Sequence, residues 1–254
     1  CIIPTHNRDE FLKDAINSVI EQTQPPIEIS VLNNLPNKQT REVVEEFKKK
    51  SPIPINYIEH NMNGKGSISY NLGAAKSKGD YVAFLDDDDM WEKNYLEKMS
   101  IFISSRKSKI TYAWFNKLKN NQKTPYKKLK ENLKMHDFLL RNPGSTVSNL
   151  IVDRDIFIGM GGFDDYTLSF DKDFLIRAIY FGYNYNVLNE FLVTQRKHAH
   201  RQNTDINEDF LLSIKKFFKK HEWIATPSIK MKFWVKYWKM YFKILINNVN
   251  KTKI

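Results

Sequence analysis

The sequence has almost no cysteine. Cys1 is the only one among 254 residues, which excludes an intrachain disulfide and any metal site built from several cysteines. This usage is typical of a reducing compartment, so we expect a cytoplasmic protein. The chain opens on Cys1-Ile2-Ile3-Pro4 without a methionine or a basic and apolar leader, and we expect it to begin inside its first strand.

Long apolar runs and internal repeats are also missing. In the C-terminal part, lysines recur so often that no segment approaches the ~20 residues that a membrane-spanning helix needs. A length of 254 residues with 41% hydrophobic content suits one substantial domain with an appendage. We therefore expect a protein that lies on a membrane at most, and does not cross it.

Acidic residues are fewer than basic ones, and the net charge is +11. The excess is confined to residues 105–134 and 213–254, which carry ten and eleven basic residues against one glutamate each. The rest of the chain is acidic, including the segments with candidate functional residues. A nucleic-acid backbone is not expected to lie across an acidic site, so we expect no nucleic-acid partner.

Short apolar runs alternate with amphipathic stretches up to about residue 105, as in βαβ units. The expected strands are Ile2-Ile3, Ile29 to Leu32, Ile55 to Ile58 and Tyr81 to Leu85. This pattern predicts an α/β fold with a mostly parallel central sheet. Residues 116–134 are rich in Lys, Asn and Gln, and we expect a surface loop there.

The most informative segment is an apolar run from residue 79 that ends in four consecutive aspartates, Asp86 to Asp89. Four adjacent like charges repel one another, and a divalent cation with bound phosphates would neutralise them. Ligands of open α/β sheets bind beyond the carboxyl ends of the strands, where this cluster lies. The alternative is a solvated turn or a helix cap. We assign a cap to Asp89, because Trp91 to Leu96 has a helical pattern.

Four segments follow one another along the chain: Pro4-Thr5-His6-Asn7-Arg8, Asp86 to Asp89, Gly161-Gly162-Phe163-Asp164 and Asp171 to Arg177. Together they resemble family 2 glycosyltransferases of the GT-A fold. The resemblance implies a Rossmann-like GT-A catalytic domain at residues 1–205, which leaves residues 206–254 as a basic helical extension. It also implies inverting transfer of a hexosyl or N-acetylhexosaminyl group from a nucleotide-diphosphate donor. The expected process is synthesis of a bacterial surface polysaccharide such as O-antigen, capsule or lipooligosaccharide.

The resemblance places Pro4, Thr5 and Asn7 against the base and ribose of the donor, with helix capping as the alternative for Thr5 and Asn7. Where the family has an aspartate pair after the second strand, this chain has Asn33-Asn34. The amide of Asn34 can pair with uracil, which favours a UDP-sugar, and after a flip it can pair with cytosine, which leaves that base open.

Gly64-Lys65-Gly66-Ser67 resembles the family segment that leads into the next helix. Lys65 would lie beside the donor diphosphate, and a simple helix-entry loop is the alternative. Many family members have arginine where this chain has Tyr70.

By the same resemblance, Asp86 and Asp88 form the DxD motif, with Asp86 toward the ribose, Asp88 on Mn²⁺ or Mg²⁺ and Asp87 assisting. Asp171 corresponds to the catalytic base that takes the proton of the acceptor hydroxyl, and helix capping is its alternative role. The family often has a glutamate at the position of Phe170, so its pair of acids is reduced to one here, and a single base implies direct displacement with inversion. For a late metal or diphosphate ligand, His200 is preferred, with His198 as the alternative.

In the tail, four lysines spaced by four, three and four residues form one stripe of a helix: Lys232, Lys236, Lys239 and Lys243. Aromatic and aliphatic residues fill much of the rest. Such a helix suits an anionic membrane surface, here the inner face of the cell membrane, or it packs on the catalytic domain. The membrane alternative implies a lipid-linked acceptor, such as a polyprenyl-diphosphate-linked saccharide; a free saccharide is the other choice.

Two other function classes stay open at this point. A metal-dependent nucleotidyltransferase would also use clustered carboxylates and a nucleotide, but would leave Asp171 without a role. A nonenzymatic basic protein would bind a membrane or a nucleic acid through its tail alone. Substitution of Asp88 and of Asp171 separates the three, because only a glycosyltransferase needs both.

Overall fold

The computed structural model describes residues 1–61, 66–165, 168–198 and 207–251, with the backbone alone for 247–251. The elements of the first half are β1 (Ile2–Thr5), α1 (Asp9–Ile20), β2 (Ile29–Asn33), α2 (Lys38–Lys50), β3 (Ile55–Glu59), α3 (Gly66–Lys76), β4 (Tyr81–Ala83), β5 (Asp89–Trp91) and α4 (Tyr95–Arg106). They are followed by β6 (Ile110–Lys119), β7 (Gln122–Lys127), η1 (Met135–Phe138), η2 (Val147–Asn149), β8 (Leu150–Asp153), α5 (Arg154–Gly159), α6 (Phe170–Tyr180), β9 (Asn186–Arg196), α7 (Glu208–Lys220), η3 (Glu222–Ile224) and α8 (Pro227–Lys251).

The first sheet is parallel, as the sequence predicts. β1 and β3 flank β2, and Ile3 lies opposite Val31 in the register. β4 continues this arrangement on the far side of β1, where Leu85 N donates to Ile2 O at 3.0 Å. Because β1, β2 and β4 run in the same direction, their carboxyl ends lie at one edge, and the residues that follow them meet there.

The second sheet departs from the expectation of a mostly parallel arrangement. Its order is β4-β8-β6-β9-β5, with β7 paired to β6, and only β6 and β9 are parallel to each other. The turn between β6 and β7 consists of Asn120 and Asn121, whose φ angles are 49° and 59°. A two-residue turn of this left-handed kind suits asparagine and joins antiparallel strands only.

The expected surface loop at residues 116–134 was wrong in part. Its first half contains the end of β6 and all of β7, and β7 is almost wholly exposed. An edge strand is polar and rich in lysine because an apolar edge would pair with other chains. The composition that suggested a loop therefore belongs to an exposed hairpin.

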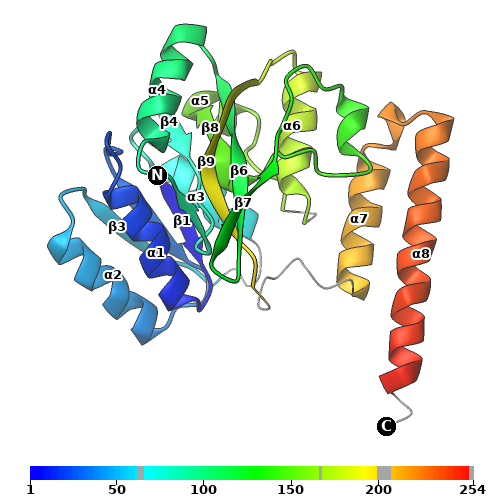
Figure 1. Cartoon of the computed structure of the whole chain (residues 1–254), viewed down its shortest axis with the longest axis horizontal. Helices are drawn as coiled ribbons and strands as arrows, with labels where there is room; N and C mark the ends of the chain where they lie inside the picture. The colour runs from blue at the N-terminus through cyan, green and yellow to red at the C-terminus, as the bar shows by residue number, and fades with distance from the viewer. Residues whose placement is uncertain (62–65, 166–167, 199–206, 252–254) are drawn as a thin grey trace.

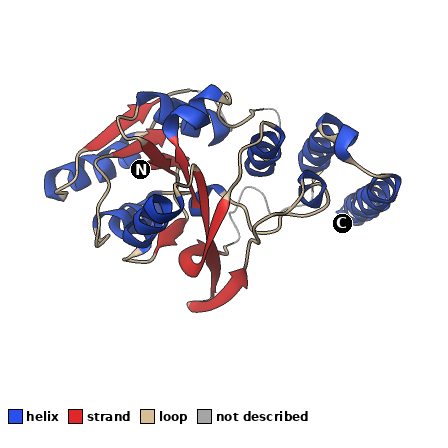
Figure 2. Cartoon of the chain, turned by 90° about the horizontal axis from the view of Figure 1, so that it is seen from above, coloured by secondary structure: helices blue, strands red, loops and turns tan. Residues whose placement is uncertain are grey.

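Helices cover both sides of the strands (Figure 2). Side chains alternate along each strand, so Ile2 and Phe84 face one buried cluster and Ile3 and Leu85 face the other. The first cluster is closed by α3, α5 and α6, and the second by α1, α2 and α4. The strand ends that carry polar residues are thus held from both faces.

The C-terminal helices extend the first cluster to one side of the molecule (Figure 1). Phe217 and Phe218 of α7 are buried in that cluster, and Phe233 of α8 stacks on Phe218 with 3.7 Å between ring centroids. The packing alternative for the tail therefore holds for these inner faces. Among the helices of the described ranges, none has both the length and the apolar composition that a membrane span requires.

Candidate active site

The four aspartates lie at the carboxyl edge of the sheet, immediately after β4. On one side, the backbone hydrogen bond between Leu85 and Ile2 fixes this segment to β1. On the other side, Asp86 N donates to Ser148 Oγ at 3.1 Å. The chain then turns, with Asp89 N donating to Asp86 O at 3.1 Å. This turn gathers successive carboxylates that an extended strand would point to opposite faces.

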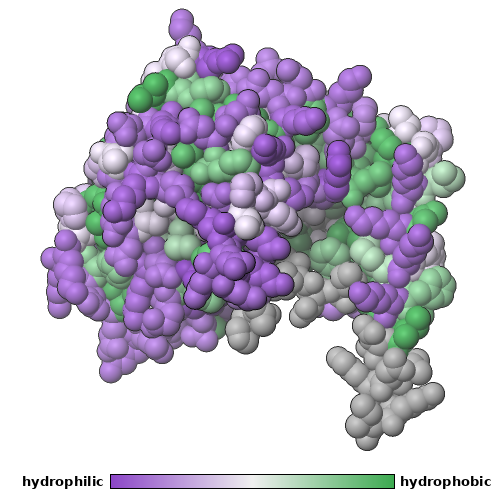
Figure 3. All heavy atoms as spheres, viewed as in Figure 1, coloured by the Kyte–Doolittle hydropathy of each residue, from purple (hydrophilic) through white to green (hydrophobic). Residues whose placement is uncertain are grey.

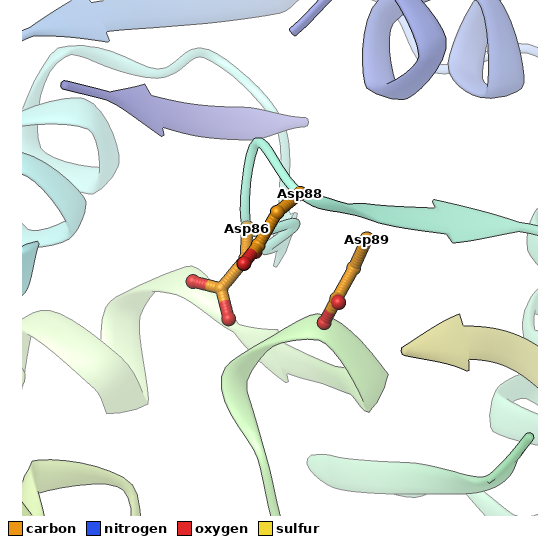
Figure 4. Close-up of side chains that lie close together, drawn as sticks. All are labelled: Asp86, Asp88 and Asp89. Atoms are coloured by element: carbon orange, nitrogen blue, oxygen red, sulfur yellow. The ribbon is translucent and has the colours of Figure 1, made fainter. Parts of the chain in front are cut away.

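Asp86, Asp88 and Asp89 could together hold a divalent cation. One carboxylate oxygen from each lies within 4.8 Å of the others, and Figure 4 shows the three side chains pointing to the same side of the loop. Asp88 and Asp89 are buried, and Asp86 is partly buried. Hard oxygen donors in this number fit Mn²⁺ or Mg²⁺. The group contains the expected Asp86 and Asp88, and it adds Asp89 as a third member.

Asp89 does not cap a helix, which corrects the expectation from the sequence. It begins β5, which pairs with β9, and the following helix α4 starts only at Tyr95. Its carboxylate accepts hydrogen bonds from Ser148 Oγ at 2.8 Å and from Arg196 N at 3.2 Å. The pairing with β9 keeps Asp89 to Trp91 extended, so the helical pattern that begins at Trp91 forms a helix only from Tyr95.

Asp87 points away from this group, toward the loop after β1. Its carboxylate accepts a hydrogen bond from Thr5 Oγ1 at 2.8 Å and forms an ion pair with Arg8 Nη2 at 2.6 Å. Burial raises the pKa of Asp87 to about 7, against the opposing charge of Arg8. Thr5 and Pro4 are themselves buried at the end of β1. Asp87 therefore ties the β1 loop to the aspartate turn.

Asp88 is contacted by two side chains that are far apart in the sequence, Arg8 and His198. Arg8 Nη1 lies 3.1 Å and His198 Nε2 lies 2.9 Å from Asp88 Oδ2. His198, the alternative ligand in the sequence, is thus at the cluster, whereas His200 and Lys65 lie outside the described residues. Sequence reasoning assigned no role to Arg8, although a cation at the end of the Pro4 to Arg8 segment was a usable signal.

Asn34 and Asn7 lie beside the same edge. His6 Nδ1 is 2.6 Å from Asn34 Oδ1, and Asn34 N donates to Thr5 O at 3.2 Å. Asn7 has a φ of 53°, which turns the chain from β1 toward α1. Three residues expected at the nucleotide base, Thr5, Asn7 and Asn34, are therefore brought together at the ends of β1 and β2.

Tyr70 contacts the cluster from α3. Its hydroxyl donates to Asp86 Oδ1 at 2.5 Å, and its side chain is fully buried. Burial, together with the charge of Asp86, raises the pKa of Tyr70 well above its usual value, so the hydroxyl keeps its proton. Sequence reasoning did not find this contact. It noted only that arginine was missing at this position.

The Gly161-Gly162-Phe163 segment serves α3 and the core behind it. Asn71 donates to Phe163 O at 2.7 Å and accepts from Phe163 N at 2.8 Å. A Cβ on Gly162 would lie 2.4 Å from Asn71 Oδ1, and Gly162 has a φ of 66°. Glycine is therefore required there for two reasons, and the motif positions Phe163 against Tyr70.

Asp171 is in the first turn of α6, and Ser169 is the N-cap residue of that helix. The carboxylate of Asp171 accepts hydrogen bonds from Asn142 Nδ2 at 2.9 Å and Lys172 N at 2.8 Å. Burial raises the pKa of Asp171 to about 6, while the charge of Lys172 acts against this rise. A carboxyl with a pKa near 6 can take up and release a proton close to neutral pH.

A single cavity joins the two groups of carboxylates. It has a volume of about 460 Å³, and both Asp86 and Asp171 line it. Phe170, at the position where the resemblance expects a glutamate, also lines this cavity. The aspartate turn and the start of α6 are 85 residues apart in the sequence, and the fold brings them to one space.

Comparison with known proteins decides the family. Residues 1–158 match the family described as Glycosyl transferase family 2. The chain belongs to this family. TuaG of Bacillus subtilis, named as a glycosyltransferase of teichuronic acid biosynthesis, is 28% identical over 45% of this chain and 45% of its own length. The Staphylococcus aureus poly(ribitol-phosphate) beta-N-acetylglucosaminyltransferase TarS is 28% identical over 43% of this chain and 19% of its own. The matches thus span less than half of these two relatives.

Solved structures show that this family 2 chain has the GT-A fold that its sequence predicts. TarS residues 1–349 of S. aureus in complex with UDP-GlcNAc superimposes with a TM-score of 0.70 and 19% identity, covering 95% of this chain and 72% of that one. The mannosyltransferase PcManGT of Pyrobaculum calidifontis, in complex with GDP-Man and Mn²⁺, gives 0.65 and 15%, covering 90% and 65%.

Proposed function

We propose that this chain is an inverting glycosyltransferase that moves a sugar from a nucleotide-diphosphate donor to an acceptor hydroxyl. The observation that carries the proposal is the cavity shared by Asp86 and Asp171. Glycosyl transfer needs a place for the departing diphosphate and a group that takes the acceptor proton. The cavity is lined by one carboxylate suited to each task.

At the donor end, Asp86, Asp88 and Asp89 would hold Mn²⁺ or Mg²⁺, which would neutralise charge on the departing diphosphate. The hydrogen bond from Tyr70 orients Asp86, and Arg8 adds a positive charge beside Asp88. His198 would join these ligands in place of His200. Arg8 is well placed to contact the diphosphate, because its guanidinium already borders the cluster.

At the acceptor end, Asp171 would take the proton of the attacking hydroxyl. Its pKa of about 6 leaves it largely ionised at neutral pH, yet close enough to accept the proton efficiently. Phe170 replaces the glutamate of the resemblance, so Asp171 is the single base in this segment. With Asp86 assigned to the metal, Asp171 is the one other carboxylate among the described residues that line the cavity, which corresponds to direct displacement with inversion.

A UDP-sugar is the first candidate for the donor, with Pro4, Thr5, Asn7 and Asn34 around the base and ribose. UDP and UDP-GlcNAc are bound in solved structures of TarS, whose fold this chain shares. The transferred group would then be a hexosyl or N-acetylhexosaminyl residue. TuaG and TarS carry names from cell-surface polymer synthesis, and we propose the same broad role for this chain.

The first test is a thermal-shift panel of UDP, CDP, GDP and dTDP, each with and without Mn²⁺. A ligand at 100 times its Kd stabilises the folded state by about 2.7 kcal/mol. We expect a Mn²⁺-dependent shift with UDP that Asp88→Asn abolishes. Asp80→Asn is the control, because Asp80 is exposed and precedes β4 at the opposite end. A shift with CDP would change the base, and no shift with any nucleotide would refute the proposal.

We also propose that residues 206–254 extend a catalytic domain at 1–205 and bind the inner face of the cell membrane. Beyond its packed face, α8 has a second apolar stripe that is exposed, formed by Met231, Val235, Trp238, Phe242 and Leu245. The predicted lysine stripe runs alongside it, and Figure 3 shows both kinds of residue on this helix. Apolar residues bordered by lysines match an anionic bilayer surface in polarity and charge.

Sedimentation with lipid vesicles tests this surface. We expect binding to vesicles that contain anionic phosphatidylglycerol, weaker binding to pure phosphatidylcholine, and loss of binding in high salt. The double variant Trp238→Ser/Phe242→Ser should bind poorly. Phe181→Ser, which changes an exposed aromatic residue outside α8, should bind normally. Equal binding by both variants would refute a membrane role for α8.

A further inference from the structure

The cavity that Asp171 lines is rich in positive charge. The cations that line it come from five parts of the fold: Lys127 of β7, Arg141 of the loop after η1, Lys172 of α6, Lys197 after β9 and Lys236 of α8. Among the described residues, only Asp86 and Asp171 line it with carboxylates. A mostly cationic cavity is ready to receive an anion.

Three of these cations, Lys127, Lys172 and Lys236, contact groups that are not carboxylates. Lys127 Nζ donates to Asn142 O at 2.8 Å, and Lys236 Nζ donates to Leu140 O at 2.9 Å. Lys172 Nζ lies 4.2 Å from the ring centroid of Phe217. Within the described part of the chain, no ion pair joins Lys127, Arg141, Lys172 or Lys236 to a carboxylate.

Burial and, to a smaller extent, mutual repulsion change the acidity of these groups. Burial lowers the pKa of Lys172 to about 8; the charge of Asp171 opposes this change and that of Lys236 adds to it. Burial and the charge of Arg141 also lower the pKa of Lys127. A bound anion among them would relieve this repulsion, because opposite charge favours the protonated form.

Apolar side chains of α7 and α8 line the same cavity. They are Phe210, Ile214, Phe217, Phe233 and Met240. Lys236 and Met240 are one turn apart on α8, so the cationic and apolar surfaces adjoin. A ligand that matches both surfaces has an anionic group next to a hydrocarbon chain.

We infer that this cavity binds an acceptor lipid whose phosphate lies among Lys127, Arg141, Lys172 and Lys236 and whose hydrocarbon chain lies along α7 and α8. Phosphate fits better than a single carboxylate, because its oxygens can accept from donors that converge from several directions. The inference rests on the proposed function, since it places the sugar of that lipid near Asp171. It gives the extension a second task, which is to form one wall of the acceptor site.

Protection of Lys172 from acylation tests this site. At pH 8, near its pKa, Lys172 should react readily with an amine-acylating reagent, and mass spectrometry measures the modified fraction. Decyl phosphate at about ten times its Kd should slow this reaction about tenfold. Decyl glucoside, which has the chain without the charge, should not protect. Inorganic phosphate should protect only at much higher concentration; equal protection at equal concentration would overturn the lipid assignment and leave a site for a soluble phosphate.

Two exposed cations provide variants that leave the core intact. Arg141→Gln and Lys236→Gln should each weaken decyl phosphate binding by about tenfold, because each removes a charged donor. Lys239→Gln is the matched control on α8, since Lys239 is exposed and does not line the cavity. Unchanged affinity in both cavity variants, or equal loss in the control, would overturn the inference.

Parallel nucleotide measurements separate this inference from the proposed function. If UDP with Mn²⁺ stabilises the chain and decyl phosphate does not protect Lys172, the acceptor inference fails and the proposed function stands. If decyl phosphate protects Lys172 and no nucleotide stabilises the folded chain, the proposed function fails. The cavity is then an anionic-lipid site in a protein that is not a glycosyltransferase. Asp88→Asn should lose the nucleotide response and keep the protection.

Discussion

The two faces of the first turn of α6 carry the same residue type in opposite states. Asp171 faces the cavity and accepts two hydrogen bonds from neutral groups, and its pKa is raised to about 6 by burial. Asp173 faces the C-terminal end of α7, where Lys220 Nζ and His221 Nε2 lie 2.7 and 2.8 Å from its carboxylate; Arg177 Nε of α6 lies at 2.7 Å.

Burial alone would raise the pKa of Asp173 as well, but the hydrogen bonds from His221 and Lys220 and the charge of Arg177 outweigh it. The pKa of Asp173 is therefore held well below its usual range. Hydrogen-bond and ion-pair partners, more than burial, therefore decide whether each carboxylate can exchange a proton or instead stabilises the fold. Asp171 is left free to exchange a proton with a ligand, and Asp173 joins α6 to α7.

Asp171→Asn should have the largest effect on activity. Loss of a general base lowers the transfer rate by about 10²- to 10⁴-fold. Folding stability at pH 7 should stay the same or rise by up to about 3 kcal/mol, because a raised pKa means that the folded state disfavours the ionised carboxyl. Steady-state kinetics and thermal unfolding measure the two effects. A variant that lost stability as well as activity would show that Asp171 is structural.

Asp173→Asn should give the reverse result. Removing one partner of a buried charge network costs about 3–5 kcal/mol, because Arg177 and Lys220 lose their counter-charge. Urea unfolding measures this loss, and transfer at a temperature where the variant is folded should fall far less than in Asp171→Asn. Asp155→Asn is the control, since Asp155 is exposed on α5. A stable but inactive Asp173 variant would reverse the assigned roles.

The sequence predicts the strands of residues 1–85 well, because buried parallel strands are marked by apolar runs between helical repeats. It also indicates Asp86, Asp88 and Asp171, through motifs in a set order. It does not reveal Arg8, Tyr70 or Asn142, whose roles depend on contacts between elements far apart in the chain. The hairpin of β6 and β7 was missed for a related reason, since an exposed edge strand has the composition of a loop.

As the pH falls, activity should be lost before folding stability, because the pKa of Asp171 is higher than that of Asp173. Below about pH 6, protonation of Asp171 should lower the transfer rate about tenfold per pH unit. The stability from Asp173 is fully present above the ordinary pKa of aspartate, about 3.9, and is lost only as the pH falls below it. A chain that stays folded near pH 4.5 while its transfer rate is about 30-fold lower would show both effects, and coincident loss of fold and activity would contradict them.

The smallest expected effect is a shift of that acid limb in Asn142→Ala. Asn142 donates to the carboxylate of Asp171, and a donor to the charged form lowers the pKa. Its removal should raise the pKa of Asp171 by up to about one unit, since a hydrogen bond to a charged group contributes roughly 1.5 kcal/mol. The acid limb of the pH–rate profile should move upward with it. Asn186→Ala, outside the cavity, should leave the limb in place. A lower rate with no shift of the acid limb would mean that Asn142 only stabilises its own loop. A shifted acid limb would show that Asn142 positions Asp171 and favours its ionised form.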